Sequence, residues 1–384
     1  MSANGSMQPS ASLSADQLVR EAREKGRNEV ALLRQHPELR SSSALAEIPE
    51  GSVCKRLMVQ AAARCPVSPE LLLRPLFVLA DSLRSRPRMR EFALRLLRAR
   101  TRVSFLRGAL ESVGWRDLQR DFGRRLPVLM YHHVGQPQPD SEPALFVSAG
   151  RFEAQLRFLA RKGYIGIRPS EWIAWVRDAR PLPAKPVLLT FDDAIADLHE
   201  HAFPVLERYG FPAVVFVPTN CVGKGNLWNY PEGYKWRPCL TAEQIQYWSK
   251  RGIEFGAHSR NHPDLTRLED RELEDEVEGS KSDLEKMIAS PVTTFAYPYG
   301  PYNDAAAACV QRHFDMGFTT DEGVNTLGTD RSLLRRVTVF DWDTLFEFGM
   351  MLRLGWSPIR RLRGHLKIRT RLAAMMRRTR ILPS

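Results

Sequence analysis

Two adjacent carboxylates follow an apolar run near the middle of the chain. The run is Val187–Phe191, and Asp192 and Asp193 come directly after it. Such a run predicts a buried strand whose carboxyl end presents both acids at the edge of a sheet. About 65 residues later stand His258 and His262, four positions apart. One carboxylate and two imidazoles can hold a divalent metal, and the second carboxylate can then serve as a general base.

Each of these residues also has a structural interpretation when it is taken alone. A histidine pair at this spacing can lie on one face of a helix or in a tight turn, and either histidine could be a surface or capping residue. Asp192 could cap a helix that begins near Ala194. The combination favours a shared site, and if Asp193 binds the metal, Asp192 is free to accept a proton from water.

The elements around these residues alternate between strands and helices. An α/β pattern of this kind predicts a mostly parallel sheet or barrel, in which catalytic residues gather after the carboxyl ends of the strands. Asp192, His258 and Tyr299 all follow expected strands. Strands are expected at 127–134, 164–167, 187–191, 213–217, 253–257, 294–297, 316–320 and 337–340, and helices at 151–162, 170–177, 195–209, 241–252, 271–288 and 304–313.

The flanks of this region have a different character. Residues 1–15 are polar and predict a disordered tail, residues 16–122 predict a basic helical region, residues 126–345 the catalytic domain, and residues 346–384 a basic amphipathic tail. Within the helical region we expect helices at 16–35, 52–64, 71–85, 88–101 and 105–122, the first capped by Ser14. No catalytic constellation stands there, so this region is interpreted as a helical bundle or docking module.

Charge divides along the same boundaries. The net charge of +12 arises from +10 in residues 1–126, −8 in 127–350 and +10 in 351–384. The basic flanks are either solvated helix faces or surfaces for anionic lipid or an acidic partner. We expect no nucleic acid as a partner, because no zinc finger or aromatic-interleaved RNA-binding motif is present.

Cysteine usage and hydropathy bear on the compartment. Five cysteines, an odd number without metal-site spacing, predict reduced thiols in the cytoplasm. The polar N-terminus lacks the apolar core of a secretory signal, and no window predicts a transmembrane helix. We therefore expect a cytoplasmic protein, with peripheral association at the inner face of the membrane as an option.

The long segment 218–240 is rich in aromatic residues: Trp228, Tyr230, Tyr234 and Trp236. A sugar face can stack on such rings, and the alternative is a flap that packs on itself. Trp228 is the candidate substrate contact in this segment.

Three motifs together resemble the polysaccharide deacetylase family, also called NodB-homology or carbohydrate esterase family 4. Thr190–Ala194 matches TFDDG with alanine in the last place, His258–His262 matches H[ST]xxH, and Tyr297–Gly300 matches YPYG. The resemblance covers about residues 126–340. It implies a distorted (β/α) barrel of seven or eight mostly parallel strands. It also implies metal-dependent removal of N-acetyl groups from a glycan. The alternatives are an O-acetyl esterase on the same site, or a degenerate barrel acting as a scaffold in a glycan-synthesis complex.

The resemblance also implies roles for single residues. Asp192 corresponds to the general base. Asp193, His258 and His262 correspond to the ligands of one divalent ion, Zn²⁺ or alternatively Co²⁺ or Ni²⁺. The backbone N–H of Tyr299 corresponds to an oxyanion donor.

The catalytic acid is implied by a second similarity. Pro127–His132 resembles the start of the exopolysaccharide (poly-N-acetylglucosamine) de-N-acetylase subgroup, which implies His132 as the acid and His133 as its rival. His133 and Tyr297 join Trp228 as candidate substrate contacts.

Two positions depart from the family pattern. The arginine that often precedes the third motif is absent from Thr294–Ala296, and Arg335 or Arg336 is the candidate replacement. Ala194 adds a methyl group where the family has glycine, which costs about 1 kcal/mol if the turn needs a positive φ.

The flanks carry similarities of their own. Gly26–Glu29 and Phe105–Ser112 are similar to helical tails of bacterial glycan-assembly glycosyltransferases. This similarity implies glycan-assembly proteins as partners. The leucine- and arginine-containing tail at 359–381 predicts contact with an anionic membrane surface.

Overall fold

A computed structural model describes residues 14–46, 78, 89–136, 145–226, 228 and 237–362. The chain packs as two units. One comprises Met1–Arg124 with Ala174–Leu182 and Thr326–Gly328, and the other comprises the remainder. The helices expected at 52–64 and 71–85 and nearly all of the tail at 359–381 lie outside the described residues, as do Tyr230, Tyr234 and Trp236.

The first unit is built on two long helices, α1 (Ala15–Gln35) and α4 (Arg90–Phe122), with the short helix η1 (Pro37–Ser42) after α1. Ser14 and Gln17 form the expected capping box. The helices cross closely because Gly26 and Gly108 have no side chains there: a Cβ on either would overlap a backbone carbonyl of the other helix. The two helices expected at 88–101 and 105–122 are one helix, with its break at Gly114, whose φ is +76°.

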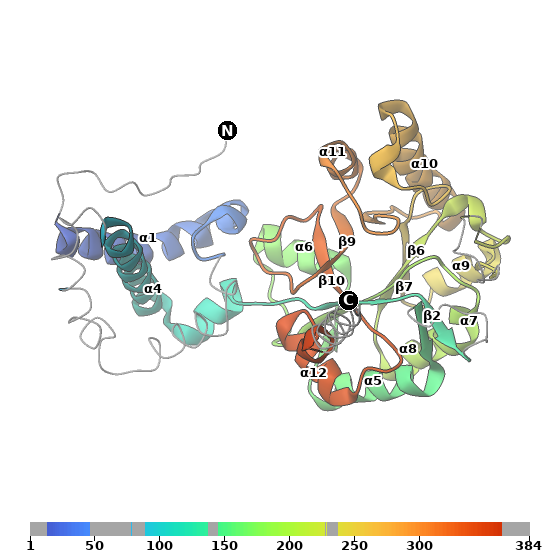
Figure 1. The fold of residues 1–384 in the computed structure, drawn as a ribbon, viewed down its shortest axis with the longest axis horizontal. Helices are drawn as coiled ribbons and strands as arrows, with labels where there is room; N and C mark the ends of the chain where they lie inside the picture. Colours follow the sequence, from blue (N-terminus) through green and yellow to red (C-terminus); the bar gives the residue numbers. More distant parts are fainter. Residues whose placement is uncertain are drawn as a thin grey trace, which may run out of the picture. The chain divides into compact units, whose positions relative to one another are not determined.

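The second unit is a closed barrel of seven parallel strands (Figure 1), as the family resemblance implies. Pairing of β1 with β5 closes it, and the short strand β4 (Ile165–Gly166) adds to the start of β5. A small separate sheet joins β2 (His133–Gly135) to β3 (Phe146–Ser148). Around the barrel the strands are β1 (Val128–Tyr131), β10 (Leu334–Thr338), β9 (Met316–Glu322), β8 (Thr294–Ala296), β7 (Ile253–Ala257), β6 (Ala213–Val217) and β5 (Pro186–Phe191).

Helices follow most strands. The single helix expected at 195–209 is two helices, because Pro204 lies in the first turn of the second one and proline interrupts a helix interior. The helical segments are α5 (Ala149–Arg161), α6 (Pro169–Asp178), α7 (Asp197–His201), α8 (Phe203–Tyr209), η4 (Thr219–Cys221), α9 (Ala242–Ser249), η5 (Leu265–Arg267), α10 (Asp270–Ile288), α11 (Asp304–His313) and α12 (Leu345–Leu354). No helix of the described residues is both long and apolar enough to cross a bilayer.

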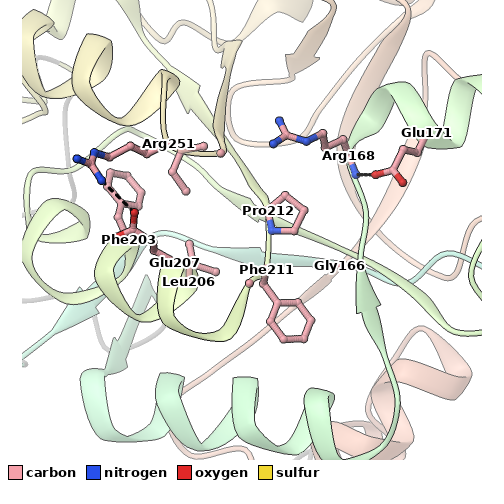
Figure 2. Close-up of a pocket in the computed structure, with 12 residues that line it drawn as sticks. Gly166, Arg168, Glu171, Phe203, Leu206, Glu207, Phe211, Pro212 and Arg251 are labelled. Atoms are coloured by element: carbon pink, nitrogen blue, oxygen red, sulfur yellow. Dashed lines mark hydrogen bonds and ion pairs between the residues drawn. The ribbon is translucent and has the colours of Figure 1, made fainter.

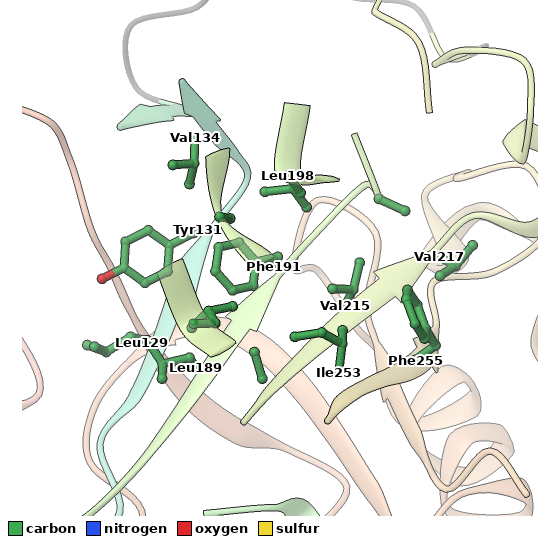
Figure 3. Packing of buried hydrophobic residues seen from close by; sticks show 14 of the residues in the cluster. Leu129, Tyr131, Val134, Leu189, Phe191, Leu198, Val215, Val217, Ile253 and Phe255 are labelled. Carbon is green, nitrogen blue, oxygen red and sulfur yellow. The ribbon is translucent and has the colours of Figure 1, made fainter. Parts of the chain in front are cut away.

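Alternation along the strands separates a helix-facing core from the barrel interior. In β5, Leu189 and Phe191 belong to the apolar cluster shared with the helices, together with Leu129 and Tyr131 of β1 (Figure 3). The intervening Thr190 therefore faces the interior, since successive side chains of a strand point to opposite sides. The same alternation directs the residue that follows the strand, Asp192, inward.

The amino ends of β6 and β7 carry a hollow of about 360 Å³ (Figure 2). Its charged side chains are already engaged: Arg251 pairs with Glu207 at 3.2 Å, Arg168 pairs with Glu254 at 3.0 Å, and Glu171 accepts a hydrogen bond from the backbone N–H of Arg168 at 2.7 Å. The acid pair lies at the opposite, carboxyl end of the strands. In barrels of this type the amino end usually serves stability rather than chemistry.

Candidate active site

The acid pair stands in a turn directly after β5. Asp192 is 3% exposed and Asp193 4% exposed. Asp193 and Ala194 both have left-handed backbones, with φ of 71° and 49°. The alanine in the family's glycine position therefore does adopt a positive φ, at a cost of about 1 kcal/mol. The Leu240 N–H donates to the Ala194 carbonyl at 2.8 Å and braces the turn.

The two histidines follow β7 in a turn rather than a helix. Ser259 and His262 adopt left-handed conformations, with φ of 60° and 59°. The His262 N–H donates to the Ser259 hydroxyl at 2.9 Å, which closes the turn. Both imidazoles thereby reach the acid pair: Nε2 of His258 lies 3.6 Å and Nε2 of His262 3.4 Å from Oδ1 of Asp193.

The donor set fits a divalent metal ion. The three ligand atoms of Asp193, His258 and His262 lie within 4.8 Å of one another. Nδ1 of His258 lies 2.7 Å from the Ala296 carbonyl, so it carries the proton and Nε2 is left as a lone pair facing Asp193. Oδ1 of Asp193 is buried and takes up no hydrogen bond within the described structure. A buried carboxylate oxygen without a hydrogen bond, 3.4 and 3.6 Å from two imidazole nitrogens, is the environment that a cation satisfies.

The histidine turn is held from outside by helix α10. Glu276, which is buried, accepts the backbone N–H groups of Arg260 and Asn261 at 2.8 and 2.9 Å. The Arg260 side chain bonds in turn to Asp283 at 2.8 Å. Gly279 leaves the space for that guanidinium, since a Cβ there would lie 2.5 Å from its central carbon.

Aromatic rings enclose His262. The ring of Trp228 stacks on the imidazole at a centroid distance of 4.2 Å, and Tyr299 meets it edge-on at 4.4 Å. Tyr299 is 53% exposed and has a φ of 60°. Its backbone N–H donates to no carbonyl among the described residues, which leaves this N–H available to a ligand.

The side chain of Arg336 fixes the carboxylate of Asp192. Its two terminal nitrogens bond to the two oxygens of Asp192 at 2.6 and 2.8 Å, and its Nε donates to the Thr319 carbonyl at 2.8 Å. Burial by itself would raise the pKa of Asp192, but the charges of Arg336, His132 and His258 and the hydrogen bonds from Arg336 together outweigh it and lower that pKa below the usual value. Asp192 does not cap α7, whose N-cap is Ala196. The neighbouring Arg335 is exposed.

His132 and His133, which follow β1, also have different partners. Nε2 of His132 lies 3.8 Å from Oδ2 of Asp192. Burial lowers the pKa of His132, and the charges of the two aspartates oppose this shift only in part. His133 points elsewhere: its Nδ1 lies 2.9 Å from Asp197 and its ring stacks on Phe146.

Two of the candidate substrate contacts are engaged within the protein. Tyr297 is fully buried, and its hydroxyl donates to the Ser332 carbonyl at 3.0 Å, so its side chain packs in the core. His133 is also buried. Trp228 is the candidate that the structure brings to the Asp193–His258–His262 group, where it stacks on His262.

A parallel (β/α) barrel with a carboxylate–imidazole group at the carboxyl ends of its strands is typical of a class of barrel hydrolases. Comparisons with known proteins identify the family within this class. The family description "Polysaccharide deacetylase" matches residues 179–318. Over 216 residues the chain is 31% identical to the Bacillus subtilis polysaccharide deacetylase homologue YxkH, covering 56% of this chain and 71% of that protein. It is 24% identical to a poly-beta-1,6-N-acetyl-D-glucosamine N-deacetylase of Staphylococcus aureus, covering 51% and 68%.

Solved structures agree with this assignment. The Streptococcus pyogenes deacetylase PplD superposes with a TM-score of 0.54 at 26% identity, over 60% of this chain and 98% of that one. IcaB from Ammonifex degensii gives a TM-score of 0.51 at 25% identity, over 60% and 97%. The chain belongs to the polysaccharide deacetylase family. It is accordingly a hydrolase of carbon–nitrogen bonds other than peptide bonds.

Proposed function

We propose that this protein removes N-acetyl groups from a glycan polymer of the poly-N-acetylglucosamine type, with one divalent metal ion in the Asp193–His258–His262 group. The observation that carries the proposal is the unlike environment of the two adjacent acids. Asp193 faces two imidazoles, whereas Asp192 is held by a buried guanidinium. The Staphylococcus relative is named for this reaction, which supports the choice of substrate.

Asp192 is the proposed general base. Arg336 fixes the carboxylate in one orientation and keeps its pKa low, so that it is ionised at neutral pH. It takes a proton from the water that attacks the acetyl carbon. The Tyr299 N–H donates to the oxygen of that carbon as negative charge develops. A divalent ion in the site would supply Lewis-acid polarisation of the acetyl carbonyl and acidify water.

His132 is the proposed general acid. It lies on the Asp192 side of the site, and its lowered pKa makes the imidazolium a stronger proton donor than a free histidine. Its proton goes to the amide nitrogen as the carbon–nitrogen bond breaks, which releases acetate and an amino sugar.

Acetate release tests the reaction class. The protein should release acetate from N-acetylated glucosamine oligomers when Zn²⁺, Co²⁺ or Ni²⁺ is supplied, and a chelator should stop it. Acetate release only from O-acetylated glycans would favour the esterase alternative. Ala194 and the missing arginine favour the scaffold alternative, whereas Arg336 supplies a guanidinium to Asp192, the proposed general base, and so favours the enzyme.

We further propose a peripheral location at the inner face of the cytoplasmic membrane, with glycan-assembly proteins or anionic lipid as partners of the basic flanks. The support is the charge distribution, +10 on each flank against −8 between them. The described cysteines, Cys221, Cys239 and Cys309, are unbridged, as expected for a reducing compartment.

A further inference from the structure

A second group of metal-ligand side chains lies between the helices α10 and α11. Its members are Glu274 of α10 and Cys309 and His313 of α11, and their ligand atoms lie within 4.8 Å of one another. Among the described residues this is the one group of that kind outside the candidate active site. It takes no part in the proposed reaction, so its arrangement needs an explanation of its own.

Helix geometry brings the two ligands of α11 together. Cys309 and His313 are four residues apart, so their side chains lie on the same face of the helix. The end of α11 is fixed to α10 by Lys281, whose Nζ donates to the His313 carbonyl at 2.6 Å and lies 5.4 Å from the ring centroid of Phe314. Glu274 therefore meets the two α11 ligands across a braced contact between helices.

The carboxylate of Glu274 is the centre of the group. Its Oε1 lies 2.6 Å from Nε2 of His313, and its Oε2 accepts a hydrogen bond from the Cys309 thiol at 3.4 Å. Metal–ligand distances of about 2.0–2.3 Å place the donor atoms of a tetrahedral zinc ion roughly 3.3–3.6 Å apart. The sulfur–oxygen pair already has this spacing, and the nitrogen–oxygen pair has to open by less than about 1 Å.

Burial leaves the group open on one side. Cys309 is 1% exposed, whereas the side chains of Glu274 and His313 are 43% and 22% exposed. An ion can therefore enter from solvent, and a water molecule can complete its coordination. Thiolate, imidazole and carboxylate together suit Zn²⁺, whereas Mg²⁺ and Ca²⁺ take oxygen ligands.

Arg312 competes with an ion for this group. Its terminal nitrogen donates to Oε2 of Glu274 at 2.6 Å, and its side chain is 62% exposed. Such an exposed ion pair contributes little to stability, so Arg312 can turn to solvent when an ion binds. The competition weakens metal binding, and we expect this site to fill only when metal is added to the purified chain.

We propose that Glu274, Cys309 and His313 bind a second divalent ion of the zinc type, which joins α10 to α11. On binding, the Cys309 thiol releases its proton to water. The imidazole keeps its proton on Nδ1, so that Nε2 of His313 offers a lone pair. Because α10 also carries Glu276, the ion would fix the helix that holds the histidine turn.

Co²⁺ absorbance tests this site without reference to activity. A thiolate bound to Co²⁺ gives a charge-transfer band in the near ultraviolet, and the candidate active site holds no cysteine, so the band reports the second site alone. Chain freed of metal by a chelator and kept under a phosphine reductant is titrated with Co²⁺. We expect a band that saturates. Cys309→Ala should abolish it, and His313→Gln should weaken Co²⁺ binding at least ten-fold, the size of effect that follows loss of one ligand.

Two further variants distinguish a metal site from a network of hydrogen bonds. Arg312→Gln removes the competing guanidinium and should tighten Co²⁺ binding several-fold. Cys221→Ala, at another buried cysteine, is the matched control and should keep the band. No band in the wild type, or a band that persists in Cys309→Ala, overturns the second site. Unchanged affinity in both His313→Gln and Arg312→Gln also overturns it.

The same titration in Asp193→Ala separates this site from the proposed function. That variant lacks a ligand of the candidate active site, yet its band should have the wild-type height. A normal band in a chain that releases no acetate supports the second site even where the proposed function fails. Loss of the band in Asp193→Ala, with native circular dichroism, would overturn an independent second site.

Discussion

At the scale of single residues, neighbours in sequence have unlike environments. Asp192 and Asp193 are adjacent, yet one meets Arg336 and the other meets two imidazoles. His132 and His133 likewise diverge, to Asp192 and to Asp197. For the acids, Asp192 continues the inward side of β5, whereas the left-handed backbone of Asp193, with a φ of 71°, turns the second carboxylate toward the histidine turn. Two adjacent residues of the same type can therefore have different functions. In each pair we propose proton transfer for one residue, and metal binding or a structural role for the other.

Replacing Arg336 should change the pH dependence of the reaction. In Arg336→Met the burial of Asp192 is countered only by the charges of His132 and His258, so the pKa of that carboxyl rises. Because activity needs the ionised base, the acid limb of the kcat/KM profile should move to higher pH. Arg335→Met, at an exposed neighbouring position, is the control and should keep the wild-type profile. An unshifted acid limb in Arg336→Met would mean that another group titrates there.

His132 and His133 can be distinguished by the same substitution at each. His132→Gln should lower kcat by about 100-fold or more, the usual contribution of a general acid. His133→Gln should have a much smaller effect, because its ring is tied to Asp197 rather than to the acid pair. The measurement is single-turnover acetate release. A larger loss at His133 would reverse the assignment.

At the scale of elements, the site is made of turns at strand ends. Asp193, Ala194, Ser259, His262 and Tyr299 are five of the seven non-glycine residues with positive φ in the described chain. Left-handed backbone at non-glycine residues costs energy and persists where the surroundings impose it. For the histidine turn, the element that imposes it is α10, through Glu276 and Arg260.

Glu276 should therefore act as a positioning residue. Glu276 accepts hydrogen bonds from the backbone and side-chain N–H groups of Asn261. Glu276→Gln replaces one of the two accepting oxygens with an NH₂ group, which cannot accept. Metal affinity should fall by about 10- to 100-fold, the range seen when support of a metal ligand is lost. Glu278→Gln, on an exposed face of α10, is the matched control. Zn²⁺ titration by calorimetry gives the readout, and equal affinity in both variants would refute the role.

How far the sequence predicts these elements depends on how local their signals are. The strands at 213–217 and 253–257 and the helix at 304–313 form with the expected bounds, because each is a short run flanked by turn residues. The grouping of Asp193, His258 and His262 was also predictable, since each residue stands in a compact motif. The choice between Arg335 and Arg336 was not, because it depends on which residue of β10 faces the barrel interior. Burial of Tyr297 depends likewise on packing against Ser332, 35 residues away.

At the scale of the whole molecule, the charge distribution separates an acidic barrel region from basic flanks. The last segment, 351–384, holds ten basic and no acidic residues. Its first part is not a free tail: α12 runs to Leu354, and Met351 and Leu352 are buried. A truncation that tests the tail should therefore begin after Leu362.

Membrane association is tested by such a truncation. The full chain should float with phosphatidylglycerol vesicles at 0.15 M salt and be released at about 1 M salt, because the attraction is electrostatic. A chain ending at residue 362 should float less, with acetate release from soluble glycan unchanged. Equal flotation of both chains would exclude the tail as the anchor.

The central claim is that Asp193, His258 and His262 hold a metal ion on which deacetylation depends. The most direct measurement is metal content and acetate release in the same preparations of the wild type and of Asp193→Ala. We predict one Zn²⁺ per chain and acetate release in the wild type, with both lost in the variant while circular dichroism stays native. Acetate release that persists in a metal-free Asp193→Ala protein would contradict the account.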